Sequence, residues 1–326
     1  MVSLERIQRA QELLRGVAVR TPLIRCFPTA GSEAASRGEL WLKPESLQPI
    51  GAFKLRGAYN KIASLTAEER RRGVISYSSG NHAQGVAYAA RALGAKAVIV
   101  MPSNAPRHKV ESTAALGAEI VTVGPASSER LQKAEELAQQ HGYVIVPPYN
   151  DEQIIAGQGT VGLEILEDLR DVDLVLVPCG GGGLISGISA AIKLSGSGAK
   201  VIGVEPKLAN DAEQSFRRGE IVELPAQRVS LTMADGLRTQ SVGAINFEHI
   251  RRYVDDFVTV GEDEIRQAMR HMAIHAHLVS EPSGAVAFAA RLFHAKELPQ
   301  AGKAVVVVSG GNVDPQLLAE VVSGDS

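Results

Sequence analysis

The sequence has few cysteines, few aromatic residues and no excess of charge of either sign. Cys26 and Cys179 are too few for a disulfide framework, so we expect reduced thiols in a cytoplasmic protein. The 34 Lys+Arg residues face 36 Asp+Glu, which leaves no basic excess to neutralise nucleic-acid phosphates. The longest apolar runs, such as residues 97–102, are far too short to cross a bilayer. We therefore expect neither a nucleic-acid nor a membrane partner.

Glycine, in contrast, is abundant, with 32 residues in a chain of 326. The glycines follow no three-residue repeat, which excludes a collagen-like fold. Short β-branched runs alternate with amphipathic helical segments, and several of the runs are apolar on both faces. This alternation predicts an α/β fold in which helices cover mostly parallel strands.

Three of the expected strands run directly into loops of small residues. The strands end before Gly80, before the glycines at 180–183 and before Gly310. Ligands of open α/β sheets bind at the carboxyl ends of the strands. The three loops therefore predict one shared ligand site.

Residues 180–183 are four consecutive glycines between an expected strand and an expected helix. Backbone amides at a helix N-terminus bind anions, because the N–H groups and the helix dipole both favour negative charge. A P-loop would need a lysine after the last glycine, and a dinucleotide fingerprint would need a third glycine where Ile185 or Ser186 stands. Glu205 could still bind a ribose from the end of the next expected strand, so a nucleotide-binding module remains an alternative.

A lysine within residues 46–58 has an unusual neighbourhood. Lys54 follows Pro49, Gly51 and Phe53 at an expected helix start, among small and apolar residues. This position disfavours the ammonium form and lowers the pKa, as an amine that forms a Schiff base requires. An ordinary surface lysine is the alternative that composition alone favours.

The segment 46–58 reads Ser-x-Gln-x-x-Gly-Ala-Phe-Lys-x-Arg-Gly-Ala and resembles the cofactor-lysine motif of the fold-type II pyridoxal-phosphate enzymes. Its resemblance is closest to the serine/threonine dehydratases and serine racemases. Three further motifs match in the family's order, at residues 78–82, 180–183 and 309–312. The resemblance covers nearly the whole chain. It implies the tryptophan synthase β-like fold, with two open, twisted, mostly parallel sheets covered by helices.

The resemblance also implies a domain organisation. Residues 1–72 and 146–326 would form a large cofactor-binding domain, and residues 73–145 a small mobile domain that closes over the substrate. A homodimer is implied as well. With no further domain expected after residue 326, we expect no feedback regulation by such an extension.

Pyridoxal 5′-phosphate is the cofactor that the resemblance implies. Lys54 would bind it as a Schiff base, and Lys54 and Ser79 are the residues with implied catalytic roles. The residues implied to hold the cofactor are Phe53, Lys54, Asn81, Gly180, Gly181, Gly182, Gly183 and Ser309. Those implied to bind the substrate carboxylate are Ser78, Ser79, Asn81 and His82.

The implied reaction is the dehydration and deamination of a β-hydroxy amino acid, such as L-threonine or L-serine. Lys54 would remove the α-proton, the β-hydroxyl would leave, and a 2-oxo acid and ammonia would form. A first alternative is an amino-acid racemase with dehydratase side activity, in which Ser79 exchanges the α-proton on the face opposite Lys54. A second is a dehydratase for phenylserine or 3-hydroxyaspartate, and Arg238 could meet the charge of an acidic substrate.

The same resemblance implies a metal site at residues 205–211. Racemase-like members hold a divalent cation with residues that correspond here to Glu205, Ala209 (through its carbonyl) and Asp211. Two carboxylates and a carbonyl suit Mg²⁺ or Ca²⁺. A solvated pair of acids is the alternative. His271 and His275 are spaced four residues apart, but we expect them to pack within a helix rather than bind zinc.

Overall fold

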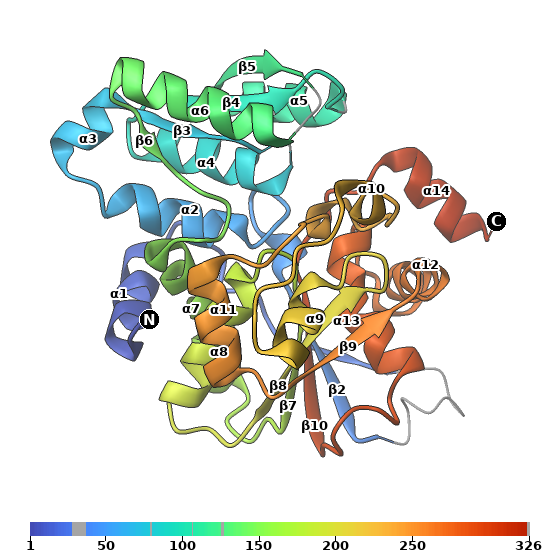
Figure 1. Ribbon diagram of the computed structural model, residues 1–326. Coiled ribbons are helices and arrows are strands. Elements are labelled where there is room, and N and C mark those ends of the chain that lie inside the picture. Colours follow the sequence, from blue (N-terminus) through green and yellow to red (C-terminus); the bar gives the residue numbers. More distant parts are fainter. Residues whose placement is uncertain (28–36, 79, 106, 125–126, 325–326) are drawn as a thin grey trace.

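The computed structural model describes residues 1–27, 37–78, 80–105, 107–124 and 127–324. Two β-sheets organise the chain, and helices flank both (Figure 1). The smaller sheet, with its helices, lies above the larger one in the view of Figure 1. The expected α/β fold is therefore confirmed. Within the described ranges, no helix is both long enough and apolar enough to cross a membrane.

The larger sheet has six strands in the order β1-β2-β10-β7-β8-β9. Their bounds are β1 Ile24–Cys26, β2 Glu39–Pro44, β7 Leu174–Pro178, β8 Lys200–Pro206, β9 Asp256–Val260 and β10 Lys303–Val308. Only the pairing of β1 with β2 is antiparallel, and the other neighbours run parallel. The carboxyl ends of five strands therefore meet at one edge of the sheet, where ligands of such folds bind.

Helices cover both faces of the larger sheet, because successive side chains of its strands point to opposite sides. On β7, Leu174 and Leu176 belong to one apolar core and Val175 and Val177 to another. The first core includes residues of α12 (Glu262–His271), α13 (Pro282–Phe293) and α14 (Pro315–Ser323). The second includes residues of α7 (Glu152–Asp168), α8 (Gly183–Leu194), α9 (Asp211–Arg218) and α11 (Ala244–Tyr253).

The smaller sheet has four parallel strands in the order β5-β4-β3-β6. Their bounds are β3 Val74–Ser76, β4 Ala97–Pro102, β5 Glu119–Val123 and β6 Val144–Ile145. Its helices are α4 (Asn81–Ala92), α5 (Arg107–Ala115) and α6 (Ser127–His141). One face packs on α4 and on α2 (Lys54–Ala63), and the other packs on α6. Helix α2 thus contributes to the small sheet's core while its first residue is Lys54.

Glycines bring α2, α7 and α8 unusually close together. A Cβ on Gly157 of α7 would lie 2.7 Å from the Cα of Gly57 on α2, and a Cβ on Gly187 of α8 would lie 2.4 Å from the backbone nitrogen of Gly159. Side chains at these positions would push the helices apart. These contacts fix the start of α2 relative to α7 and to α8, the helix that begins directly after Gly182.

The remaining elements are short or lie at the periphery. Their bounds are α1 Leu4–Leu14, η2 Glu45–Leu47, α3 Ala67–Arg72, α10 Ala226–Val229, η3 Asp235–Leu237 and η4 Met272–Ala276. The last is a π-helical turn where the sequence predicts a continuous α-helix from residue 262 to 277. The amide of His277 donates to the carbonyl of Met272, five residues earlier, and His277 has a φ of 55°. The widened turn ends the helix before the loop that leads to α13.

Candidate active site

Two of the three small-residue loops, those at 78–82 and 309–312, meet beside the start of α2. The amide of Phe53 donates to the carbonyl of Ser309 at 3.1 Å, and Ala52 forms an isolated antiparallel bridge with Gly310. The Asn312 side-chain amide donates to Asn81 Oδ1 and to the Ile50 carbonyl, both at 2.8 Å. Segments more than 200 residues apart in the sequence therefore form one edge of the site.

Lys54 is the first residue of α2, and its side chain enters a desolvated environment. Its Nζ donates to the carbonyl of Pro148 at 2.8 Å and lies 5.1 Å from the centre of the Phe53 ring. Burial lowers the pKa of Lys54 to about 8, although the nearby Glu281 favours the charged form. A substantial fraction of this amine is therefore neutral near pH 8, as a nucleophile or general base requires.

The glycine loop lies between β7 and α8 and is closely surrounded. Gly182 has a φ of +91°, in the left-handed region that favours glycine. A Cβ on Gly182 would lie 2.9 Å from Asn246, and a Cβ on Gly181 would lie 2.3 Å from the Tyr149 ring. Because α8 begins at Gly183, its free amides face the same edge of the sheet as the loop. The loop can therefore present backbone donors to an anion at short range.

The loop after β3 supplies polar groups to the site. Asn81 opens α4, and its side-chain amide donates to Glu281 Oε1 at 2.6 Å. The Gly80 amide donates to Ser78 Oγ at 3.4 Å. Burial, together with the charge of Lys54, lowers the pKa of His82 to about 3, so its ring is neutral. Ser79, a predicted catalytic residue, lies outside the described residues.

His82 has a defined orientation. Its Nε2 lies 3.0 Å from the carbonyl oxygen of Val146, so this nitrogen carries the proton. Its Nδ1 is buried and has no hydrogen-bond partner among the residues that the structure describes. A buried, unprotonated ring nitrogen is free to accept a hydrogen bond from a ligand.

Ser309 and Glu281 lie on the side of the site formed by β10 and α13. Ser309 is 4% exposed, and its hydroxyl donates to the carbonyl of Ser283 at 3.4 Å. Glu281 precedes α13 and is also 4% exposed. Burial, together with the charge of Asp235, raises the pKa of Glu281 to about 8, while the Asn81 hydrogen bond acts in the opposite direction. Near neutral pH this carboxyl therefore holds its proton.

Comparison with known proteins agrees with this arrangement. The family model described as "Pyridoxal-phosphate dependent enzyme" matches residues 14–310. The chain belongs to this family. It is 45% identical to the "L-threonine ammonia-lyase" of Thermotoga maritima over 99% of this chain and 79% of that protein. It is 43% identical to the "L-threo-3-hydroxyaspartate ammonia-lyase" of Saccharomyces cerevisiae over 88% of this chain and 86% of that protein.

Solved structures of the family have the same fold. The structure of maize serine racemase superimposes with a TM-score of 0.92 at 35% identity, covering 99% of this chain and 97% of that one. The pyridoxal-phosphate family therefore accounts for the two-sheet architecture, and the expected resemblance to fold-type II enzymes is confirmed.

In this family member, Glu205 and Asp211 form a buried pair next to the glycine loop. Glu205, on β8, accepts hydrogen bonds from the amides of Ala212 at 3.2 Å and Glu213 at 2.7 Å. Asp211 opens α9, and its Oδ2 is buried without a hydrogen-bond partner in the described part of the chain. Burial raises the pKa of Asp211 to about 7, and burial with the charge of Asp211 raises that of Glu205.

Other candidate ligand groups do not form a metal centre. Within the described part of the chain, no group of three or more His, Cys, Asp and Glu side chains could hold a metal ion. The rings of His271 and His275 lie 4.6 Å apart, and His271, the last residue of α12, packs against Phe288 as expected, whereas His275 is exposed and lies in the π-helical turn. The Arg238 guanidinium donates twice to the Thr232 carbonyl, at 2.6 and 2.9 Å, so it is occupied by the backbone.

Tyr149 and Pro148 are site residues that the sequence did not single out. Pro148 binds the Lys54 amine and the Tyr149 ring packs against Gly181, although both precede α7 and follow no recognisable motif. Burial raises the pKa of Tyr149 to about 12, so its hydroxyl keeps its proton. Only the folded chain brings these residues to the site.

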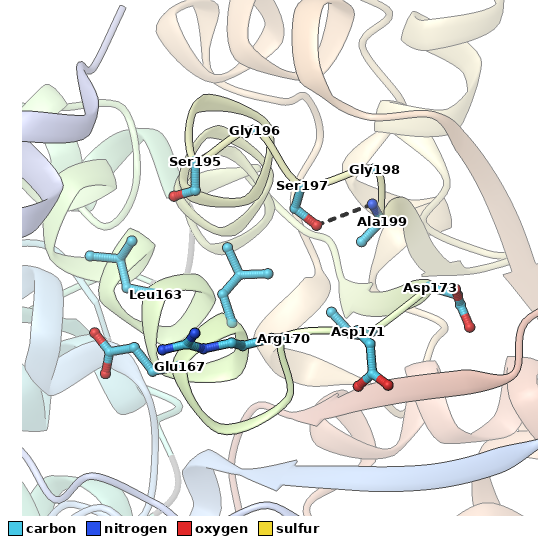
Figure 2. Close-up of a pocket in the computed structure, with 12 residues that line it drawn as sticks. Leu163, Glu167, Arg170, Asp171, Asp173, Ser195, Gly196, Ser197, Gly198 and Ala199 are labelled. Atoms are coloured by element: carbon cyan, nitrogen blue, oxygen red, sulfur yellow. Dashed lines mark hydrogen bonds between the residues drawn. The ribbon is translucent and has the colours of Figure 1, made fainter.

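A separate cavity of about 770 Å³ lies at the other end of the large sheet (Figure 2). It is lined by the last turns of α7, by residues 171–173 before β7 and by residues 195–199 before β8. These segments precede their strands, whereas the glycine loop follows β7. None of the predicted site residues that the structure describes lines this cavity.

Proposed function

We propose that this protein catalyses the dehydration and deamination of L-threonine or L-serine to a 2-oxo acid and ammonia. The observation that carries the proposal is the desolvated Lys54 amine, which lies among the three loops at the carboxyl edge of the parallel strands. The 45% identity to an L-threonine ammonia-lyase supports this substrate class.

Pyridoxal phosphate, when bound, supplies an electron-withdrawing ring that acidifies the α-proton of an amino acid. Lys54 Nζ is the covalent anchor and then the base that accepts this proton. Its lowered pKa supports the assignment, because a neutral amine is available near physiological pH. The substrate's β-hydroxyl then leaves as water, and hydrolysis of the resulting enamine releases ammonia.

The glycine loop and α8 are proposed to hold the phosphate. The phosphate would accept hydrogen bonds from the amides of residues 180–183, and the close contacts of Gly181 and Gly182 support a position where only glycine leaves room. Phe53 would pack near the ring, Asn81 would bind its hydroxyl, and Ser309 would face its nitrogen. A serine at that nitrogen leaves the ring less protonated than a carboxylate would, which favours rapid loss of the β-substituent.

The substrate carboxylate is proposed to bind at residues 78–82. Ser78 and Ser79 bring hydroxyls there, and α4 brings its N-terminal amides together with Asn81. The neutral ring of His82 lies in the same turn, and its second nitrogen has no partner among the described residues. No cationic side chain is needed for this site, because the helix N-terminus supplies the favourable field.

The test is a spectroscopic and mass measurement. The purified protein should be yellow, and borohydride should fix the cofactor mass on the peptide that contains Lys54. The Lys54→Ala variant should lose this labelling and the formation of 2-oxo acid from threonine. A colourless protein that binds NAD would contradict the proposal and favour the nucleotide-binding alternative.

Racemisation is the second candidate function, and the close match to maize serine racemase favours testing it. Ser79 would exchange the α-proton on the face opposite Lys54. Chiral analysis of the serine that remains during turnover decides the question. Fully retained L-configuration would exclude racemase activity. D-serine that the wild type forms and Ser79→Ala does not form would support it.

A divalent cation, Mg²⁺ or Ca²⁺, is proposed to bind Glu205, the Ala209 carbonyl and Asp211. The buried Asp211 Oδ2 without a partner supports this, since a buried carboxylate oxygen is costly when unpaired. A chelator should lower the melting temperature of the wild type and leave that of Asp211→Asn unchanged. If the chelator changes neither stability nor activity of the wild type, no cation is bound there.

The division into a large domain (residues 1–72 and 146–326) and a small mobile domain (73–145) is proposed as well. The separate four-stranded sheet supports it, because β3 to β6 all fall within residues 73–145. A cytoplasmic homodimer is the proposed form of the protein. Light scattering on the purified protein tests the oligomeric state.

A further inference from the structure

An ion pair connects the unit of the four-stranded sheet to the turn that lies against the glycine loop. Lys109 lies on α5, which packs with the four-stranded sheet, and its Nζ pairs with the carboxylate of Asp235, the first residue of η3. The Lys109 side chain is 12% exposed and that of Asp235 37%. Ion pairs between described residues of 73–145 that stay within that unit include Lys96–Glu119, Arg107–Glu111 and Lys133–Glu136.

The backbone of η3 lies directly against the glycine loop. A Cβ on Gly180 would lie 3.2 Å from the Cα of Leu237 and 3.5 Å from the carbonyl oxygen of Gly236. The amide of Gly236 also donates to Ser283 Oγ at 2.9 Å, and the Ser283 carbonyl accepts from Ser309. Asp235 therefore starts a turn that touches both the proposed phosphate loop and the proposed ring-nitrogen side of the site.

The ion pair also lies within electrostatic range of the site's own charges. Asp235 raises the pKa of Glu281 and Lys109 lowers it, and Glu281 in turn interacts with Lys54 and binds Asn81. Lys109 is thus a cation that the small sheet brings to this side of the site, and Asp235 already neutralises it. Arg238 keeps its positive charge, but two of its N–H donors are directed to the Thr232 carbonyl.

We propose that the Lys109–Asp235 ion pair excludes amino acids with a negatively charged side chain and so restricts this enzyme to neutral β-hydroxy amino acids. The inference rests on the proposed function, which it narrows. A substrate β-carboxylate would have to displace Asp235 from Lys109 and would then lie close to a second, unpaired carboxylate. Like charges at such distances oppose binding, whereas the methyl group of threonine disturbs neither partner.

The proposal is tested by the binding of two unreactive amino acids. L-Aspartate and L-2-aminobutyrate lack a β-hydroxyl, and their dissociation constants can be titrated through the change in cofactor absorption on the holoenzyme. The wild type should bind 2-aminobutyrate more tightly than aspartate. Asp235→Asn frees Lys109 and should shift the ratio of the two constants toward aspartate about tenfold.

Two variants separate this effect from general damage. Lys109→Gln combined with Asp235→Asn should lose the shift, because the gain depends on the freed cation. Asp171→Asn makes the same change in an exposed pair with Lys303 at the opposite end of the sheet, and should leave the ratio as in the wild type. An unchanged ratio in Asp235→Asn, or a wild type that already prefers aspartate, would overturn the inference.

Turnover is measured separately on threonine, serine and L-threo-3-hydroxyaspartate. Wild-type protein that forms no 2-oxo acid from threonine or serine would refute the proposed function, whereas the binding ratios would still decide the role of the ion pair. Threonine turnover together with an unchanged ratio in Asp235→Asn would leave the proposed function standing and remove the inference.

Discussion

Replacement of Arg56 by methionine should destabilise the protein strongly, because Arg56 is the centre of a buried charge network. Its guanidinium donates to Glu45 at 2.7 and 2.9 Å and to Glu164 at 2.6 and 2.9 Å. Lys43 Nζ donates to Glu164 at 2.6 Å and to the Thr21 carbonyl at 2.6 Å. The network holds two cations and two carboxylates, and the side chains are at most 7% exposed.

The expected cost follows from the charge balance. In Arg56→Met, Lys43 alone faces two buried carboxylates, so one carboxylate loses its counter-charge. Breaking a buried pair by removing one partner costs about 3–5 kcal/mol. Arg71→Met provides the control, since Arg71 pairs with Glu68 on the surface, where both side chains are more than 60% exposed and the loss should be at most about 1 kcal/mol.

Urea denaturation of holoenzyme at pH 7 and pH 5 measures both the size and the cause of the loss. In the wild type Arg56 holds the pKa of Glu45 below its usual value despite burial. The stability that the Arg56–Glu45 ion pair contributes therefore weakens as the pH falls. In Arg56→Met, burial without Arg56 should raise the pKa of Glu45, and protonation should relieve the variant at low pH. The stability difference should therefore shrink from pH 7 to pH 5. A loss below about 1 kcal/mol, or an equal loss at both pH values, would refute the reasoning.

Three further predictions concern the site and its supports. The melting temperature of Glu281→Gln should rise relative to that of the wild type as the pH increases from 5 to 8.5. The wild-type carboxyl, with its pKa raised to about 8, keeps its proton at pH values at which the unfolded chain has lost it, so the wild type loses stability across this window. Gly187→Ala should lower the free energy of unfolding in denaturant titrations by about 1–3 kcal/mol or more, because the new Cβ would lie 2.4 Å from backbone atoms of α7. Gly198→Ala, with open space around residue 198, should lower it less. The rate at which the apoprotein couples to pyridoxal phosphate can be followed by absorbance, and it should rise around pH 8 as Lys54 loses its proton. A rise only near pH 10.5 would contradict the lowered pKa.

The strands and loops of the site were largely predictable from the sequence. The runs at 174–178 and 303–308 are apolar on both faces, as buried parallel strands require, and the structure has strands there with the expected loops after them. Lys54 was predicted at a helix start with a lowered pKa, and the structure agrees on both points. Local composition was sufficient in these cases, because glycine and β-branched residues constrain the backbone directly.

The partners of the site residues were not predictable in the same way. Pro148 accepts the hydrogen bond of Lys54, and Asp235 pairs with Lys109, across 94 and 126 positions of sequence. No spacing rule relates such residues, since their contact depends on how α2, α5 and η3 pack. The π-turn at 272–276 escaped prediction for a similar reason: its apolar spacing equals that of an α-helix, and the hydrogen bond from the His277 amide to the Met272 carbonyl, five residues earlier, distinguishes the two.

The hydrogen bonds of Asn81 show why the site depends on the arrangement of both sheets. Asn81 opens α4, which packs against the four-stranded sheet, yet its side chain binds Glu281 and Asn312 from segments that adjoin the six-stranded sheet. Its amide donates to the first and its oxygen accepts from the second, so a rotation of α4 away from the large sheet breaks both bonds. Glu281 would then lose the donor that opposes its raised pKa. Opening of the small sheet would therefore change the protonation of a carboxyl that interacts with Lys54, which couples the position of α4 to the charge state of the base.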